Sequence, residues 1–292
     1  MVRYYRKHKI GITSFSTINV KPLSGYVGAE IDGINLKKIS EEQFEEIKIA
    51  FGEYGVIFFR NQSLLPQEEI TFAEYWGKIN INRFFTNLEG YPKIALVSKE
   101  PNQKKNIGSD WHTDHTYDLE PAMGSILFAH QVPKNGGDTM FSSMYAAYES
   151  LSDGLKDTLK NLYGRHSSRH VFGKSYAERN DDTVGRIINS DQANQDAIHP
   201  VIITHPETGR KALFVNPTFT LGFQGWSDEE SKSLLQYLYS HATKPEFTCR
   251  FKWEEGSIAF WDNRSTWHLA VNDYHGERRL MHRITIDGTR LT

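Results

Sequence analysis

Residues 257–271 read SIAFWDNRSTWHLAV and contain a strong strand signal. Its first part, SIAFW, is an apolar run with the length of a buried strand, and the polar residues after it predict a turn. From Ile94 onward similar short runs alternate with Gly, Pro, Asn and Asp, which predicts a mostly β body. HPETGR at 205–210 predicts a hairpin turn between two of the runs. The other runs are IALV (94–97), SILFAH (125–130), VIIT (201–204), ALFV (212–215), FTCRF (247–251) and HRITI (282–286).

Helices are expected to pack on this body. Capping-box patterns occur at 40–43 and 227–230, and apolar residues at helical spacing follow each of them. The first of these helices should end at Gly55, and the run VIFF (56–59) after it predicts a buried strand. The expected helices therefore lie at 41–55, 66–76, 145–162 and from 228 onward.

The composition indicates one compact domain over residues 1–292. The 38% of hydrophobic residues provide enough apolar material for a large core. A net charge of −2 gives no overall attraction to nucleic acid or to an acidic membrane surface, so we expect a small-molecule partner. The basic start, residues 1–15, predicts a flexible tail. The long polar stretch 167–194 predicts a lid or a mobile segment.

Cysteine usage limits the chemistry. Cys249 is the only cysteine, and one thiol makes neither an internal disulfide nor a thiolate cage for zinc. A metal would therefore be held by histidine and carboxylate. The sequence contains no stretch of 18 uninterrupted apolar residues and no apolar signal-peptide segment near its start. We expect a soluble, cytoplasmic protein that does not enter the membrane.

Three residues form a candidate metal site. His112 and Asp114 are two positions apart, so in an extended backbone both side chains project from one face and can share an ion. His268 follows the strand signal SIAFWDN, where a β-rich fold would present it at a strand end. Two histidines and one carboxylate suit Fe(II) oxygenases because they leave coordination positions open. Zinc carrying a hydrolytic water is the chemical competitor.

Two arginines near the end of the sequence are candidates for binding an anionic cosubstrate. Arg279 and Arg283 are four apart, so on a strand they share a face with Met281 and Thr285. A guanidinium in a cleft is suited to bidentate binding of a carboxylate. The alternative is a solvated strand edge.

Four ordered motifs carry a resemblance to a known family. They are WHTDHTY (111–117), GGDTMF (136–141), WDNRSTWHLAVNDY (261–274) and RRLMHRITI (278–286). In this order and with these separations they resemble the taurine dioxygenase (TauD/TfdA-like) branch of the Fe(II)/2-oxoglutarate-dependent oxygenases, and the likeness runs from Val20 to Asp287. The resemblance implies a double-stranded β-helix, or jelly roll, with helices outside it.

The resemblance also implies roles for single residues. His112, Asp114 and His268 would hold Fe(II), while 2-oxoglutarate and O₂ would be cosubstrates that yield succinate, CO₂ and a hydroxylated product. Thr139 and Arg283 would bind the far carboxylate of 2-oxoglutarate. Arg279 matches a second family arginine close to the site. Family members form dimers or tetramers, and the sequence leaves the oligomeric state open.

The substrate-binding positions depart from those of taurine-specific members. Where those members carry His, Tyr and Asn, this sequence carries Asn82, Phe85 and Gly108. The last two changes remove a hydroxyl and an amide, so a polar amine would lose its partners. Taurine is therefore a doubtful substrate.

Other candidate substrate residues indicate a small anion. Ser175 and Tyr176 resemble the Ser-Phe of the family's substrate lid, and Phe219 falls at an aromatic wall position. Lys174 is either a further anion contact or a solvated lid charge. A sulfonate, a sulfate ester or a carboxylate is the expected substrate class.

Two other functional classes remain open on the residues alone. One is a zinc-type metallohydrolase with the same three ligands, although it gives Thr139 and Arg283 no role. The other is a non-catalytic jelly-roll binding protein, which would not need a complete ligand set.

Overall fold

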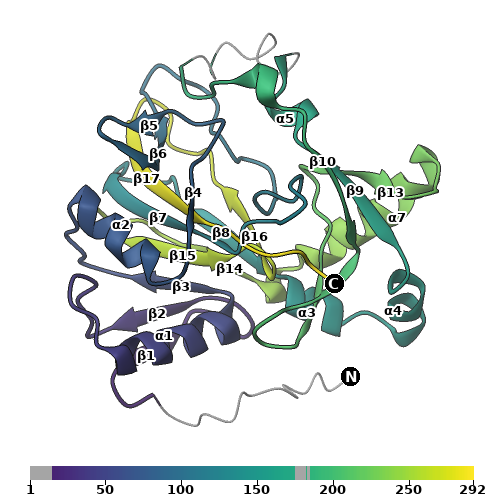
Figure 1. Cartoon of the computed structure of the whole chain (residues 1–292), viewed down its shortest axis with the longest axis horizontal. Helices are drawn as coiled ribbons and strands as arrows, with labels where there is room; N and C mark the ends of the chain where they lie inside the picture. Colours follow the sequence, from purple (N-terminus) through teal and green to yellow (C-terminus); the bar gives the residue numbers. More distant parts are fainter. Residues whose placement is uncertain (1–14, 175–181, 183–184) are drawn as a thin grey trace.

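The computed structural model describes residues 15–174, 182 and 185–292. Figure 1 shows a body of β-sheets with helices on its outside, and the mostly β jelly-roll prediction is confirmed. Its largest sheet has nine strands, and several of them pack against α1 and α2 in one of the apolar core clusters. In spatial order, the strands are β1 (Asn19–Pro22), β2 (Ala29–Asp32), β3 (Val56–Phe59), β15 (Ile258–Asp262), β7 (Gly124–Gln131), β17 (Arg279–Ile286), β6 (Tyr91–Lys99) and β5 (Asn87–Leu88), and β4 (Ile79–Asn80) pairs with β17.

Three smaller sheets complete the β body. One of them carries site residues and has the order β14 (Thr248–Phe251), β8 (Thr139–Ser143), β16 (Thr266–Ala270). The second has the order β10 (Asp196–Pro200), β9 (Tyr163–Ser167), β13 (Thr220–Phe223). The third is the hairpin of β11 (Ile202–Thr204) and β12 (Lys211–Leu213), which confirms the turn predicted from HPETGR.

The helices pack against the sheets as amphipathic elements. Helix α1 (Glu41–Tyr54) contacts β2, β3 and β15, helix α2 (Pro66–Glu74) contacts β6 and β17, and α7 (Asp228–Ala242) contacts β13. In Figure 1, α1 and α2 lie on the left of the molecule and α7 on the right. The remaining helical segments are α3 (Met144–Glu149), α4 (Asp153–Leu159), α5 (Arg169–Phe172), η2 (Ser190–Gln192) and η3 (Pro245–Phe247).

Three of the four helix predictions are confirmed, and one is wrong in its extent. The capping boxes that begin α1 and α7 are both formed, and α2 ends at Glu74 rather than at Trp76. The expected helix over 145–162 is two helices, α3 and α4. Ser152 separates them because its backbone is extended and its side chain accepts a hydrogen bond from the backbone N–H of Leu155. It therefore caps a new helix and does not continue the old one.

Removal of the α1 cap is expected to destabilise the protein modestly. The Ser40 hydroxyl accepts a hydrogen bond from the Gln43 N–H at 3.2 Å, and the Gln43 side chain accepts one from the Ser40 N–H at 3.1 Å. We expect Ser40→Ala to lower the free energy of unfolding by about 1 kcal/mol. Chemical denaturation would measure it, with Ser63→Ala, an exposed loop serine, as the control. Equal stability of the two variants would contradict the role assigned to the cap.

Aromatic stacking joins the layers of the core. Phe58 of β3 stacks on Phe251 of β14, with ring centroids 4.0 Å apart. Phe51 of α1 stacks on Phe260 of β15 at 4.2 Å. These contacts link the large sheet to a smaller sheet on one side and to a helix on the other, so the strands that carry the site have rigid backing.

The segment predicted as a lid is only partly described. Within 167–194, α5 and η2 are folded, and the Phe172 side chain of α5 is buried. Residues 175–181, 183 and 184 lie outside the described residues, as do 1–14 of the predicted tail, so both expectations stay predictions. In the described part of the chain, no helix is both long and apolar enough to cross a bilayer.

Candidate active site

The three predicted metal ligands converge at one point. His112, Asp114 and His268 each offer one ligand atom, and these atoms lie within 4.8 Å of one another. The Nε2 atoms of the two histidines are 3.7 and 3.8 Å from the Asp114 carboxylate oxygens. These distances are too long for hydrogen bonds but fit donors arranged around a shared ion. All three side chains are buried.

Backbone pairing fixes the two histidines beside each other. His112 and His268 form an isolated antiparallel bridge, with N–H to carbonyl distances of 3.1 and 2.8 Å, and their ring centroids are 4.0 Å apart. His112 Nδ1 lies 2.7 Å from the backbone oxygen of Asp110. Since a carbonyl can only accept, Nδ1 carries the hydrogen and Nε2 presents its lone pair toward Asp114.

The electrostatics of the site suit metal binding. Burial lowers the pKa of both His112 and His268, so both imidazoles stay neutral as ligation requires. Burial alone would raise the pKa of Asp114, but the positive charge of Arg283 beside it outweighs this effect and holds the pKa well below its usual range. The carboxylate is therefore ionised and ready to bind a cation.

A hydrogen-bond chain orients the Asp114 carboxylate. Asp114 Oδ2 accepts a hydrogen bond from Ser125 Oγ at 2.9 Å, and Arg283 Nη2 forms an ion pair with the same oxygen at 2.7 Å. Ser125 in turn accepts from the side-chain amide of Asn263, and Trp261 Nε1 donates to the oxygen of that amide at 2.9 Å. The turn between β15 and β16 thus supports one metal ligand while β16 carries another, His268.

The two arginines have different surroundings. Arg283 contacts Asp114 and Ser125 as described. The Arg279 guanidinium lies 5.6 Å from the ring centre of Trp253, whose Nε1 donates to Thr139 Oγ1 at 2.9 Å. Arg279 is buried, yet its Nε and Nη2 find no hydrogen-bond partner among the residues the structure describes. Burial lowers the pKa of Arg279, and nearby Tyr274 and Asp138 oppose this effect without cancelling it, so the guanidinium is a desolvated cation that is only partly compensated.

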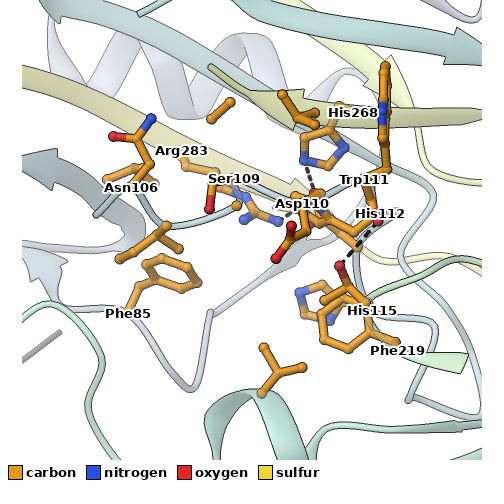
Figure 2. A pocket seen from close by; sticks show the side chains of 18 of the residues that line it. Phe85, Asn106, Ser109, Asp110, Trp111, His112, His115, Phe219, His268 and Arg283 are labelled. Carbon is orange, nitrogen blue, oxygen red and sulfur yellow. Dashed lines mark hydrogen bonds and ion pairs between the residues drawn. The ribbon is translucent and has the colours of Figure 1, made fainter. Parts of the chain in front are cut away.

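These groups line one cavity of about 630 Å³. Figure 2 shows His268, His112 and Arg283 near its centre, with Phe85 on the left and Phe219 on the right. Every predicted site residue within the described ranges lines this cavity: Asn82, Phe85, His112, Asp114, Thr139, Phe219, His268, Arg279 and Arg283.

The positions that depart from the taurine pattern have structural roles. The Asn82 side-chain oxygen accepts from the N–H groups of Phe84 and Phe85 at 2.9 and 3.0 Å, so this oxygen orients the Phe85 loop. Gly108 has φ +78°, and a Cβ there would lie 3.0 Å from the His112 ring. An asparagine at 108 would therefore crowd a metal ligand.

The predicted lid residues are only partly placed. Ser175 and Tyr176 lie outside the described residues, so their expected role stays a prediction. Lys174 is exposed and is not among the described residues that line the cavity. The solvated-charge interpretation of Lys174 fits this position better than the anion contact.

Sequence reasoning missed a polar group that lines the cavity. His115 follows Asp114 directly and has φ +59°, which is rare for a residue other than glycine. Its Nδ1 lies 2.9 Å from Asp118, a carboxylate that also accepts two hydrogen bonds from Arg83. Its Nε2 is buried and has no hydrogen-bond partner within the described ranges. A non-glycine residue with positive φ inside a ligand motif is a signal visible only in coordinates.

Comparison with known proteins agrees with this geometry. Residues 19–285 match the family described as "Taurine catabolism dioxygenase TauD, TfdA family". An alkylsulfatase of Acinetobacter baylyi is 34% identical, over 93% of this chain and 85% of its own. An alpha-ketoglutarate-dependent sulfate ester dioxygenase of Pseudomonas putida is 31% identical, over 93% and 90%.

A solved structure shares the fold. The crystal structure of a taurine dioxygenase from Burkholderia xenovorans superimposes with a TM-score of 0.81 at 34% sequence identity, covering 95% of this chain and 93% of that one. Family match, relatives and architecture agree over nearly the whole sequence. This chain belongs to the TauD/TfdA family of 2-oxoglutarate-dependent dioxygenases.

Proposed function

We propose that this dioxygenase binds Fe(II) through His112, Asp114 and His268 and oxidises a C–H bond of a small anionic substrate, with alkyl sulfate esters as the class that fits best. The observation that carries the proposal is the convergence of three candidate ligand atoms in a cavity that also contains the buried Arg279 guanidinium, two of whose nitrogens have no hydrogen-bond partner among the described residues. Bound iron, O₂ and 2-oxoglutarate would together supply the oxidant, with release of succinate and CO₂. A zinc hydrolase would need no second anion site, and family membership favours the oxygenase.

Arg279 and Thr139 are the pair that we assign to the far carboxylate of 2-oxoglutarate. Arg279 lies over the ring of Trp253, and Trp253 Nε1 donates to Thr139 Oγ1, so both residues contact the same side chain. The Arg279 nitrogens that have no partner among the described residues would be satisfied by a bound anion. The sequence resemblance assigned this role to Arg283. Because Arg283 is already paired with Asp114, we assign it instead to the support of that carboxylate and to the substrate side of the cavity.

The anionic group of the substrate would bind between Arg283 and His115. Arg283 Nε is a buried atom with no hydrogen-bond partner in the described part of the chain, and the same holds for His115 Nε2. Both residues line the cavity beside the metal ligands. A sulfate group bound there would place its neighbouring carbon close to the metal, which is the geometry that oxidation of that carbon requires.

The rest of the cavity suits an apolar chain. Phe85, Tyr117, Phe172 and Phe219 are buried and line it. Phe172 lies 6.3 Å from Phe85 and 6.0 Å from Phe219, measured between ring centroids. Apart from the Tyr117 hydroxyl this wall is apolar, so an alkyl group would gain free energy from burial against it, whereas the charged amine of taurine would be desolvated there. The alkylsulfatase and sulfate ester dioxygenase relatives support the same class.

The proposed reaction on a sulfate ester balances. One oxygen atom of O₂ enters the C–H bond beside the ester oxygen, and the other enters succinate as 2-oxoglutarate loses CO₂. The new hydroxyl then loses its proton while the carbon–oxygen bond to sulfate breaks with its electron pair. The products are an aldehyde, sulfate, succinate and CO₂.

A substrate panel tests this proposal. With Fe(II) and 2-oxoglutarate present, we expect hexyl sulfate to give a higher kcat/KM than taurine, hexanesulfonate or hexanoate, measured by O₂ uptake. Two further methylenes, from butyl to hexyl sulfate, should raise kcat/KM about tenfold, at roughly 0.8 kcal/mol for each buried methylene. Omission of 2-oxoglutarate is the control and should abolish O₂ uptake.

Two outcomes would contradict the proposal. Preference for taurine or hexanoate would overturn the sulfate ester assignment alone. Sulfate release that continues without O₂, or that zinc supports as well as Fe(II), would overturn the oxygenase mechanism.

A further inference from the structure

A second cluster of potential metal ligands lies on the outer face of the large sheet. Glu69 of α2, His130 of β7 and His282 of β17 each offer one ligand atom, and these atoms lie within 4.8 Å of one another. Successive side chains of a strand point to opposite faces. Arg283 lines the catalytic cavity, so its neighbour His282 faces away from that cavity toward α2. The cluster is thus separated from the catalytic ligands by the sheet itself.

The donor atoms are already close to metal-binding geometry. His130 Nε2 is 2.8 Å from Glu69 Oε1, and His282 Nδ1 is 3.0 Å from Glu69 Oε2. The two imidazole rings lie 3.7 Å apart between centroids. Four donors in a tetrahedron about 2.0 Å from a zinc ion are about 3.3 Å apart. Small side-chain shifts would therefore admit the ion.

A β-bulge helps to form the cluster. In the pairing of β17 with β7, Met281 lies opposite Ala129 and Leu280 opposite Gln131, so His130 is the extra residue. Bulges of this kind redirect a side chain and are common beside functional sites. Here the bulge lies beside the position from which His282 reaches Glu69, and it places His130 next to that contact.

The cluster also has an open side. Glu69 and His282 are buried, while the His130 side chain is 32% exposed. Glu69 and His130 line a cavity of about 400 Å³ on this face. A water molecule entering from it could be the fourth ligand, as in three-residue zinc sites.

We propose that Glu69, His130 and His282 form a second metal site, which binds Zn²⁺ through two histidine nitrogens and one carboxylate oxygen. The ligand set of nitrogen and carboxylate oxygen suits zinc, and the ion would replace the hydrogens that now link the imidazoles to Glu69. Bound zinc would tie α2 to the two central strands of the sheet. The site is independent of the dioxygenase reaction.

The alternative occupant of the cluster is a proton. In that case, hydrogen bonds between Glu69 and the two imidazoles would hold α2 in place without an ion. Substitution of these residues would then leave zinc binding by the protein unchanged, so the measured zinc stoichiometry distinguishes a hydrogen-bonded cluster from a metal site.

The experiment measures zinc bound per chain by equilibrium dialysis, in protein that lacks a histidine tag. The catalytic site will also take zinc, so the test uses the His112→Ala/His268→Ala variant, which removes two catalytic ligands. We expect one zinc per chain in this variant and none after the further change His130→Gln. Glu69→Gln, which preserves side-chain shape, should have the same effect. His275→Gln, at an exposed histidine, is the matched control and should keep one zinc.

The melting temperature shows whether each variant is folded and whether it binds zinc. Zn²⁺ should raise the Tm of the His112→Ala/His268→Ala variant and of its His275→Gln derivative, but not that of the His130→Gln derivative. Zinc stoichiometry unchanged by His130→Gln and Glu69→Gln would overturn the proposal. Absence of zinc from the His112→Ala/His268→Ala variant would overturn it as well.

Discussion

Replacement of Asp114 by alanine is expected to abolish succinate formation. The variant loses the one carboxylate among the three proposed iron ligands, and Arg283 loses its ion-pair partner at 2.7 Å. A buried cation left without its partner also destabilises a protein, by about 3–5 kcal/mol. We therefore expect no succinate above background together with a lower unfolding free energy, measured by chromatography of the products and by chemical denaturation.

The matched control for this prediction is Asp157→Ala. Asp157 is an exposed carboxylate on α4 that forms a surface ion pair with Lys160, so its loss should leave succinate formation and stability nearly unchanged. Asp114→Asn separates charge from shape, since it keeps the volume but removes the anion. Succinate formation at half the normal rate or more in Asp114→Ala would mean that the carboxylate is not an iron ligand.

Local sequence pattern predicted the parts of the fold that depend on local interactions. The capping boxes at Ser40 and Ser227 form because the residues that make them are three apart in the chain. The split of the expected 145–162 helix was missed because Ser152 can be either a helical residue or a cap, and only its extended backbone decides. Strands such as β8 and β9 were also missed, because their sequences, TMFSS and YGRHS, contain buried polar residues and give no apolar run.

The convergence of the candidate metal ligands could be predicted from the sequence, whereas the residues that orient them could not. His112 and Asp114 share a short motif, and the family resemblance supplied His268. Ser125 orients Asp114 from 11 residues away and receives a hydrogen bond from Asn263, 138 residues away. Contacts over such separations depend on the packing of whole sheets, so no spacing rule in one sequence reveals them.

The roles of the two arginines illustrate the same limit. Strand alternation correctly predicted that Arg279 and Arg283 would share a face, and both line the cavity. Strand alternation does not predict which side chains contact each arginine. Arg279 lies over Trp253, which precedes β15, and Arg283 pairs with Asp114, which follows the Gly108 turn. The assignment of the cosubstrate therefore rests on tertiary contacts.

Arg279→Ala is expected to raise the 2-oxoglutarate concentration needed for half-maximal rate by roughly 10- to 150-fold. A hydrogen bond to a charged group contributes about 1.5–3 kcal/mol. Two buried nitrogens of Arg279 have no partner among the described residues, so both are available to bind the 2-oxoglutarate carboxylate. Titration of 2-oxoglutarate at saturating Fe(II) and substrate, followed by O₂ uptake, measures the effect. Arg279→Lys should recover only part of it, because an ammonium cannot bind a carboxylate in the bidentate manner of a guanidinium.

Arg283→Ala is the variant that decides between the two assignments. If Arg283 binds the substrate anion and supports Asp114, its loss should weaken binding of substrate and iron more than binding of 2-oxoglutarate. The sequence resemblance predicts the reverse, with the larger 2-oxoglutarate effect in Arg283→Ala.

The free energy of unfolding of the two variants gives a second measurement. Removal of Arg279 deletes a buried charge whose Nε and Nη2 have no hydrogen-bond partner among the described residues, so the protein without ligands should keep or gain stability. Removal of Arg283 breaks a buried ion pair and should lower the stability.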